Sequence, residues 1–145
     1  PLPGWLLVSC DVGQGDSFVG RLPGDDVLVI DSGPDPRAVD RCLARLGVER
    51  VALLVLTHLH ADHVEGVPGV LRGRQVAQVE IGPLDEPAVE RQRLRGWLGA
   101  NGVPVVRAPT GAVRTAGHGG WEGVGGWGGV LVGWVGQEEE WQVGY

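Results

Sequence analysis

The chain has 145 residues and a mass of 15.3 kDa, which corresponds to a single domain with a sizeable core. Hydrophobic residues make up 43% and charged residues 21%, a composition that excludes a disordered or collagen-like chain. The longest apolar runs, such as 51–56, are far shorter than the ~18 residues of a transmembrane helix. The formal net charge of −6 excludes attraction of nucleic acid by the overall field, leaving a local basic surface or bound metal ions for that purpose.

Two features bear on the setting of the chain. It begins at Pro1 and contains no methionine, so we expect it to be a piece of a longer protein. Cys10 and Cys42 are its only cysteines, too few for a disulfide framework and not in a CxxC spacing. We therefore expect two reduced, buried cysteines.

The first third of the sequence predicts three strands. Apolar and β-branched runs cover 5–10, a segment starting at 18, and 27–30. The last two flank a Pro-Gly-Asp-Asp segment at 23–26, which is typical of a hairpin.

Helices and strands alternate after this point. Asp35 and Pro36 are typical of a helix start, and an apolar stripe at i, i+3, i+4 and i+7 continues to residue 46, before Gly47. The later expected elements are a strand over 51–57, a short helix over 63–71, a strand over 76–81, a helix over 86–100 and a strand over 103–107. The fold class is therefore α/β with a mixed sheet, since the first three strands have no helices between them.

The composition changes near residue 115. Residues 119–145 hold 10 of the 26 glycines and 4 of the 6 tryptophans, and only 130–135 predicts a strand. We therefore divide the chain into a domain over 1–115 and a Gly/Trp-rich tail over 116–145. Two interpretations of the tail stay open: a functional segment, or a disordered segment that comes from an out-of-frame reading of a GC-rich gene. The second is favoured because this segment shows no helix caps, no apolar periodicity and no clear turn residues, unlike the first 110 residues.

A histidine cluster follows the apolar strand 51–57. His58, His60 and His63 lie within six residues, beside Asp62, in the pattern HxHxDH. Residues i and i+2 of an extended segment point the same way, so His58 and His60 can hold one metal ion together. Asp62 and His63 come where the chain turns into a helix and face a second ion. Imidazole and carboxylate suit Zn²⁺ and also Mn²⁺.

The HxHxDH motif after a hydrophobic strand resembles the signature of the metallo-β-lactamase superfamily. Two further segments resemble one branch of it: Asp-Val-Gly-Gln-Gly-Asp at 11–16 and Val-Ile-Asp-Ser-Gly-Pro at 29–34. With Leu-Thr-His-Leu-His-Ala-Asp-His at 56–63, they resemble the C-terminal domain of ComEC-type DNA-uptake (competence) proteins, in their actinobacterial form. The resemblance covers residues 5 to about 114.

The resemblance implies the N-terminal half of a four-layer αββα fold. It also implies a hydrolase with two divalent metal ions, Zn²⁺ or Mn²⁺, acting as a nuclease or phosphodiesterase on DNA. His60 and Asp62 are then catalytic residues as well as metal ligands. The domain would lie at the extracytoplasmic face of the membrane, attached to the membrane-embedded remainder of its parent protein. The alternatives are a general metallo-hydrolase acting on a thioester or lactam, and a truncated metal-binding remnant without catalysis.

Three residues upstream of the histidine cluster are expected to support it. Asp31, at a strand end, is placed to orient a ligand histidine. Gln14 and Asp16 are expected to form hydrogen bonds with the HxHxDH segment at 58–63, which we call the metal loop. For Asp31 and Asp16 an ordinary turn role is the alternative.

The later part of the chain departs from the family pattern. No Gly-Asp pair follows residue 63, and no His-His-Gly-Ser segment occurs. His118 is a further candidate ligand, with a chance loop histidine as the favoured alternative. The arginines at 72, 74, 91, 93 and 95 could contact phosphates, but a solvated surface is the favoured interpretation.

Overall fold

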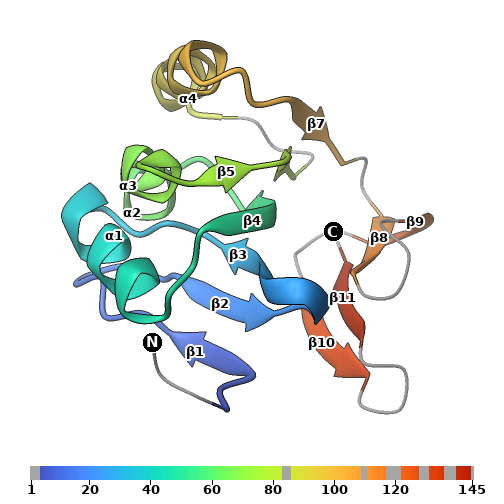
Figure 1. Ribbon diagram of the computed structural model, residues 1–145. Coiled ribbons are helices and arrows are strands. Elements are labelled where there is room, and N and C mark those ends of the chain that lie inside the picture. The colour runs from blue at the N-terminus through green and yellow to red at the C-terminus, as the bar shows by residue number, and fades with distance from the viewer. Residues whose placement is uncertain are drawn as a thin grey trace.

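The computed structural model describes the backbone of residues 4–82, 86–108, 111–116, 122–127, 131–135 and 140–144, and the side chains of residues 4–82 and 86–108. Helices and two β-sheets make up the molecule (Figure 1). In this view the helices lie toward the left and the top, and the smaller sheet lies toward the lower right. The expected α/β class with a mixed sheet is confirmed.

The larger sheet has seven strands in the order β1-β2-β3-β4-β6-β7, and β5 pairs with β4. Strands β1 to β3 are antiparallel, whereas β3, β4, β6 and β7 run parallel. The 3-10 turn η1 (Pro23–Asp25) closes the expected hairpin. The strands are β1 (Leu7–Ser9), β2 (Phe18–Arg21), β3 (Asp26–Ile30), β4 (Arg50–Leu56), β5 (Gln75–Val76), β6 (Val79–Ile81) and β7 (Val105–Arg107). The strand expected over 76–81 is thus two short strands.

The helices are α1 (Pro36–Arg45), α2 (Ala61–Val64), α3 (Val67–Leu71) and α4 (Ala88–Ala100). Asp35 caps α1, and its carboxylate accepts a hydrogen bond of 2.8 Å from the Arg37 backbone N–H. The single helix expected over 63–71 is two short helices, separated near Gly66. No helix in the described part of the chain has the length and apolar character needed to span a bilayer.

Both faces of the larger sheet are apolar. In β3, Val27 and Val29 belong to the core that includes buried residues of α1, α3 and α4, whereas Leu28 and Ile30 belong to a second cluster on the opposite face. Side chains alternate between faces along a strand, so a strand that is buried on both sides becomes a continuous apolar run. The expectation that residues 51–57 form such a strand is confirmed by β4, of which all but the first and third residues are buried.

The smaller sheet is antiparallel, with the order β10-β11-β8-β9. Its strands are β8 (Gly111–Ala116), β9 (Glu122–Trp127), β10 (Leu131–Val135) and β11 (Glu140–Gly144). The sequence predicted only the strand near 130–135. Ladder hydrogen bonds use backbone groups that every non-proline residue carries, so glycine-rich segments can pair without showing a period-two apolar pattern. The division of the chain at residue 115 stays a prediction.

Cys10 and Cys42 form a disulfide, so the expectation of two reduced cysteines is wrong. Cys10 follows β1 and Cys42 lies on α1, 32 residues later, with their Cα atoms 5.8 Å apart. That separation lies within the usual range for a disulfide. The pairing could not be predicted from the sequence because only the packing of α1 against the sheet brings the two residues together.

Gly66 allows a backbone-to-backbone contact beneath the histidine segment. A Cβ atom on Gly66 would lie 2.0 Å from the Ser32 carbonyl oxygen and 2.9 Å from that of Gly33. Gly66→Ala is therefore expected to lower the free energy of unfolding in urea by about 1–3 kcal/mol, because backbone must shift. The matched control is Gly96→Ala on α4, where a Cβ meets nothing within 4 Å. It should be neutral or stabilising by up to ~1 kcal/mol. Equal effects of the two substitutions would contradict the tight contact.

Candidate metal centre

The histidine segment begins where β4 ends. Leu56 is the last residue of β4, His60 is the N-cap of α2, and Asp62 and His63 lie inside α2. Asp31 directly follows β3, the parallel neighbour of β4. Parallel strands bring their carboxyl ends to one edge of the sheet, which is why Asp31 and the histidines meet although 27 or more residues separate them.

Asp31 is the centre of a hydrogen-bond network. Its carboxylate accepts from the Thr57 backbone N–H at 2.9 Å and from the Thr57 hydroxyl at 2.7 Å. It also lies 2.8 Å from His63 Nδ1. The Asp31 residue is 3% exposed and has a positive φ of 58°. The Asp31 carboxylate thus contacts Nδ1 of His63, and Asp62 contacts Nε2, the other nitrogen of the same ring. Orientation of this histidine by Asp31 stays a prediction.

These contacts favour particular tautomers of two histidines. An ionised carboxylate can only accept, so the Asp31 contact favours the neutral tautomer with the proton on His63 Nδ1, which leaves Nε2, 3.3 Å from Asp62 Oδ2, as the nitrogen available to a metal ion. The Thr57 hydroxyl donates to Asp31 and lies 3.1 Å from His58 Nδ1, so its oxygen can accept a hydrogen bond from an N–H at that nitrogen. One carboxylate thereby directs His63 and, through Thr57, His58 to present Nε2 as the free electron donor.

Burial changes the pKa values of two groups. It raises the pKa of Asp31, and the hydrogen bonds from Thr57 and His63 oppose that change. Burial also lowers the pKa of His58 from its ordinary value of 6.5, and the positive charge that His63 can carry lowers it further. His58 is therefore favoured in the neutral form, which is the form that binds metals.

The candidate ligands form close pairs. The rings of His58 and His60 have centroids 5.0 Å apart, and those of His58 and His63 are 3.8 Å apart. Asp62 Oδ2 lies 3.3 Å from His63 Nε2. Of these three distances only the 3.3 Å one joins two possible ligand atoms, and it is close to the separation of about 3.4 Å expected for two ligand atoms on one tetrahedral zinc ion. The donor set of imidazoles and a carboxylate thus fits a divalent metal in its chemistry.

The number of donors falls short of a complete site. Within residues 4–82 and 86–108, no three His, Cys, Asp or Glu side chains are grouped so that they could hold one ion. Structural and catalytic zinc sites use at least three protein ligands. His118, the further candidate ligand, lies outside the described residues.

Two polar residues that the sequence analysis did not single out also contact the site. Thr57 links Asp31 to His58, as described above. The Ser32 hydroxyl and backbone N–H both donate to the His63 carbonyl oxygen, at 2.7 and 2.9 Å. Thr57 stands next to His58 in the sequence, and that adjacency to the motif was the available signal. Ser32 carried no comparable signal, because it lies 31 residues before His63.

The Asp11–Ser17 loop reaches the site through its backbone. The Asp16 carbonyl oxygen accepts from the Gly33 N–H at 3.1 Å, and a Cβ on Gly15 would lie 2.4 Å from the Asp62 carbonyl oxygen. The side chains of Gln14 and Asp16 are exposed, and neither makes a hydrogen bond to His58–His63 in the described part of the chain. Their expected side-chain bonds to the metal loop stay a prediction.

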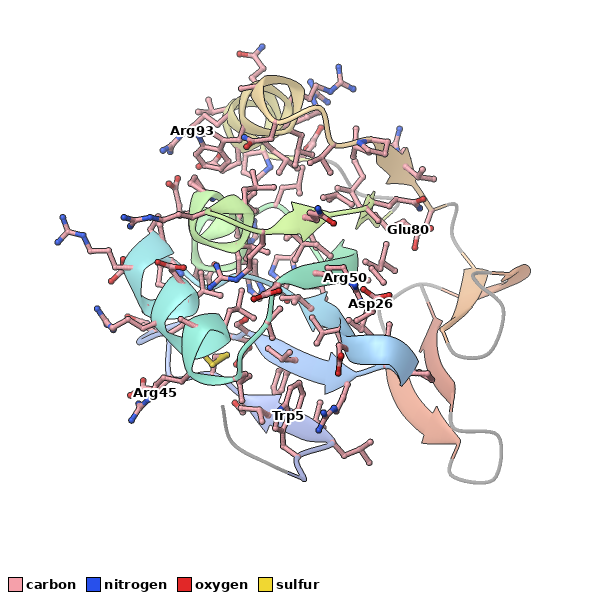
Figure 2. All side chains as sticks on the ribbon, viewed as in Figure 1. Trp5, Asp26, Arg45, Arg50, Glu80 and Arg93 are labelled. Atoms are coloured by element: carbon pink, nitrogen blue, oxygen red, sulfur yellow. A yellow bond between two sulfur atoms is a disulfide. The ribbon has the colours of Figure 1, made fainter. Side chains whose placement is uncertain are left out.

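Two of the candidate phosphate-binding arginines are engaged in internal contacts. The side chain of Arg74 is 6% exposed and bonds to Asp40 and to the carbonyl oxygens of Val48 and Gly69. Arg93, labelled on α4 in Figure 2, pairs with Glu65 and lies over the Trp97 ring. The favoured interpretation of a solvated surface is therefore wrong for Arg74, whose side chain is buried, whereas it fits the half-exposed Arg93.

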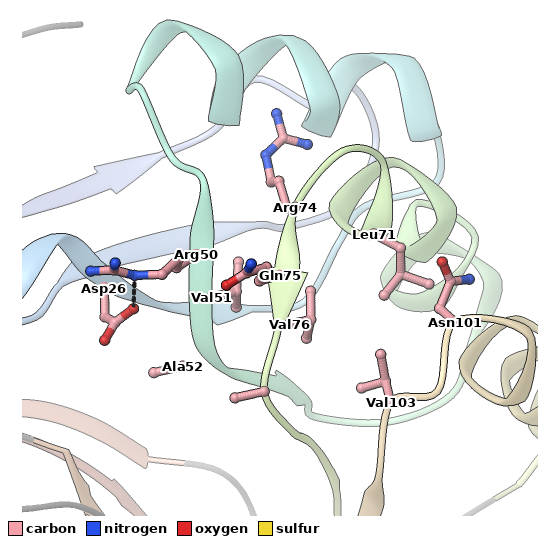
Figure 3. A pocket seen from close by; sticks show the side chains of 11 residues that line it. Asp26, Arg50, Val51, Ala52, Leu71, Arg74, Gln75, Val76, Asn101 and Val103 are labelled. Carbon is pink, nitrogen blue, oxygen red and sulfur yellow. Dashed lines mark hydrogen bonds and ion pairs between the residues drawn. The ribbon is translucent and has the colours of Figure 1, made fainter.

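A pocket of about 480 Å³ lies at the other edge of the sheet, where β4 and β5 begin (Figure 3). Its polar lining includes Arg50, paired with Asp26 at 3.0 Å, and Arg74. The histidines lie at the opposite, carboxyl ends of the strands and do not line it. We therefore locate the candidate site by its titratable groups rather than by this pocket.

Comparison with known proteins gives one family. The sequence profile of the Metallo-beta-lactamase superfamily matches residues 10–136. A search of curated proteins returns no significant match. Members of this superfamily are in general metal-dependent hydrolases, and the match covers most of the chain, from before the Asp11–Ser17 loop to beyond β10. The chain therefore belongs to the metallo-β-lactamase superfamily.

Proposed function

We propose that this chain is a metal-dependent phosphodiesterase of the nuclease type that acts on DNA during its uptake. The observation that carries the proposal is the network around Asp31, because it engages Nδ1 of His58 and His63 and leaves their Nε2 atoms available to a metal ion, with His60 and Asp62 close to these rings. The motifs at 11–16 and 29–34, which resemble those of ComEC-type competence proteins, favour DNA over a thioester or lactam. Attachment to a membrane-embedded remainder at the extracytoplasmic face is part of the same proposal.

The proposed ligands are His58 and His60 for one divalent ion, and Asp62 and His63 for a second. Zn²⁺ or Mn²⁺ bound there would supply Lewis-acid activation of water and of a phosphate group. The chain's own residues prepare the donors: Asp31 holds the proton on His63 Nδ1, and Thr57 fixes the ring of His58. His60 and Asp62, two residues apart at the start of α2, are the proposed catalytic residues.

Substitution of His60 tests the ligand assignment. His60→Ala is expected to abolish tight Zn²⁺ or Mn²⁺ binding at the first site, because only His58 remains there. Metal content per chain after dialysis, measured by mass spectrometry of the elements, should fall by one ion. Arg95→Ala, on the exposed face of α4, is the matched control and should leave the content unchanged. An unchanged metal content in His60→Ala would contradict the assignment of His60 as a ligand.

A metal-binding domain without turnover is the second candidate. It is favoured by the absence of a three-donor group among the residues with described side chains. Cleavage of single-stranded DNA with added Mn²⁺ distinguishes the two candidates. A phosphodiesterase with a complete metal site cleaves the DNA, whereas a metal-binding domain without turnover does not.

A further inference from the structure

The disulfide between Cys10 and Cys42 stands at the base of the loop that lies on the histidine segment. Cys10 ends the β1 side of this loop, and its backbone N–H donates to the Ser17 carbonyl oxygen at 2.8 Å, which closes the loop. Cys42 lies on α1, which packs into the main core. The yellow sulfur–sulfur bond is visible beneath α1 in Figure 2. The covalent bond therefore ties the loop base to a rigid helix.

The loop contacts the site at two backbone points. Gly15, with φ of 147°, approaches the Asp62 carbonyl so closely that a Cβ would lie 2.4 Å from its oxygen. At the next loop residue, the Asp16 carbonyl oxygen accepts a hydrogen bond of 3.1 Å from the Gly33 backbone N–H. Val12 packs against Gly33, where a Cβ would lie 2.6 Å from the valine Cβ. Displacement of the loop would thus release both the Asp62 backbone and the residues that follow Asp31.

We infer that oxidation of Cys10 and Cys42 is required to hold the Asp11–Ser17 loop against the metal loop, so that the redox state of this pair controls the order of the site. The part of this inference that concerns metal binding rests on the proposed function. Formation of the bond breaks two S–H bonds and makes one S–S bond. The two electrons and two protons reduce an external disulfide to two thiols. Such bonds persist in oxidising compartments such as the cell surface or periplasm, which agrees with the proposed extracytoplasmic face.

The pair is suited to a stable structural bond that can still be tested by reduction. Cys10 is 6% exposed, while Cys42 is half-buried and reachable by a small reductant. No other cysteine occurs in the chain, so no alternative pairing competes. The 32-residue separation means that the bond restricts a long segment of the unfolded chain, which stabilises the folded state.

Hydrogen exchange tests the inference without metal. The full chain is oxidised with glutathione disulfide and compared with the same chain reduced by a phosphine, and with the double variant Cys10→Ala, Cys42→Ala. Reduction should raise the exchange rate of the Gly33 amide about tenfold more than it raises that of the Leu54 amide. The Leu54 amide donates to the Gln78 carbonyl oxygen in the centre of the sheet and exchanges through global unfolding, so its rate reports the general loss of stability. The melting temperature should fall by roughly 10 °C.

Zinc affinity, measured by competition with a chromophoric chelator, should fall about tenfold in the reduced chain and in the double variant. Reactive thiols in the oxidised chain, or equal exchange of Gly33 in both redox states, would overturn the inference. Equal loss of protection at Gly33 and Leu54, in both the reduced chain and the variant, would also overturn it, because the effect would then be global. Failure of the oxidised chain to bind zinc would count against the proposed metal site alone, since the Gly33 amide still decides the role of the disulfide.

Discussion

Replacing Asp31 with alanine is expected to lower the free energy of unfolding by about 3–5 kcal/mol, among the largest effects of any single substitution in this chain. Three donors lose their acceptor at once: the Thr57 N–H, the Thr57 hydroxyl and His63 Nδ1. They lie in a buried or half-buried site where water cannot replace the carboxylate freely. The positive φ of 58° at position 31 adds to the loss, because alanine adopts that conformation less readily than aspartate. Urea unfolding followed by fluorescence measures the change.

The variant Asp31→Asn separates stability from metal binding. Asparagine has nearly the same shape and tolerates a positive φ, so it should keep more of the stability than alanine. Its amide cannot accept from all three donors, and its NH₂ group can donate to His63 Nδ1 and move the ring proton to Nε2. The affinity for zinc should then fall by about 10–100-fold. Thr57→Ser, which keeps the hydroxyl, is the control and should bind zinc nearly as the parent does. Zinc binding of Asp31→Asn at the parent's affinity would refute the proposed control of the tautomer.

The second large effect concerns turnover. The 145-residue chain, supplied with Mn²⁺, is expected to cleave single-stranded DNA far more slowly than the ~1 s⁻¹ that is ordinary for enzymes. Each proposed ion has two ligands within the described residues, and two ligands fix neither the position of the ion nor that of a bound phosphate. Correct placement of reacting groups can supply ~7–11 kcal/mol of the barrier reduction, so its loss costs several orders of magnitude in rate.

The measurement is a single-turnover assay with end-labelled DNA, run on the parent chain and on Asp62→Ala. Asp62→Ala should remove whatever metal-dependent cleavage the parent shows, whereas Arg45→Ala, which changes an exposed residue in the last turn of α1, should leave it unchanged. Cleavage by the parent at ~1 s⁻¹ or faster, abolished by Asp62→Ala, would contradict the expected weakness. In that case His118 becomes the leading candidate for the additional ligand.

The sequence by itself determined those features that depend on neighbouring residues. The Asp35–Pro36 start of α1 and the apolar run of β4 were predicted, because helix capping and the pattern of apolar residues are local properties of the chain. The α/β class was also predicted, because it follows from the order of the elements. The HxHxDH segment follows β4 directly, whereas its role in metal binding stays a prediction. The sequence predicted that Asp31, a carboxylate at a strand end, lies near a histidine of the HxHxDH segment. Only the structure shows that this histidine is His63.

Only the tertiary structure decided which distant residues meet. The disulfide, predicted as two free thiols, depends on α1 lying against the end of β1, which no local pattern encodes. Thr57 and Ser32 acquire their roles only when the ends of parallel β3 and β4 lie side by side. Three strands of the smaller sheet, β8, β9 and β11, were missed for a related reason: their pairing uses backbone groups common to all residues, and their sequence carries no clear apolar period. Local chemistry thus indicates the candidate metal-binding segment, whereas long-range packing decides which distant residues contact it.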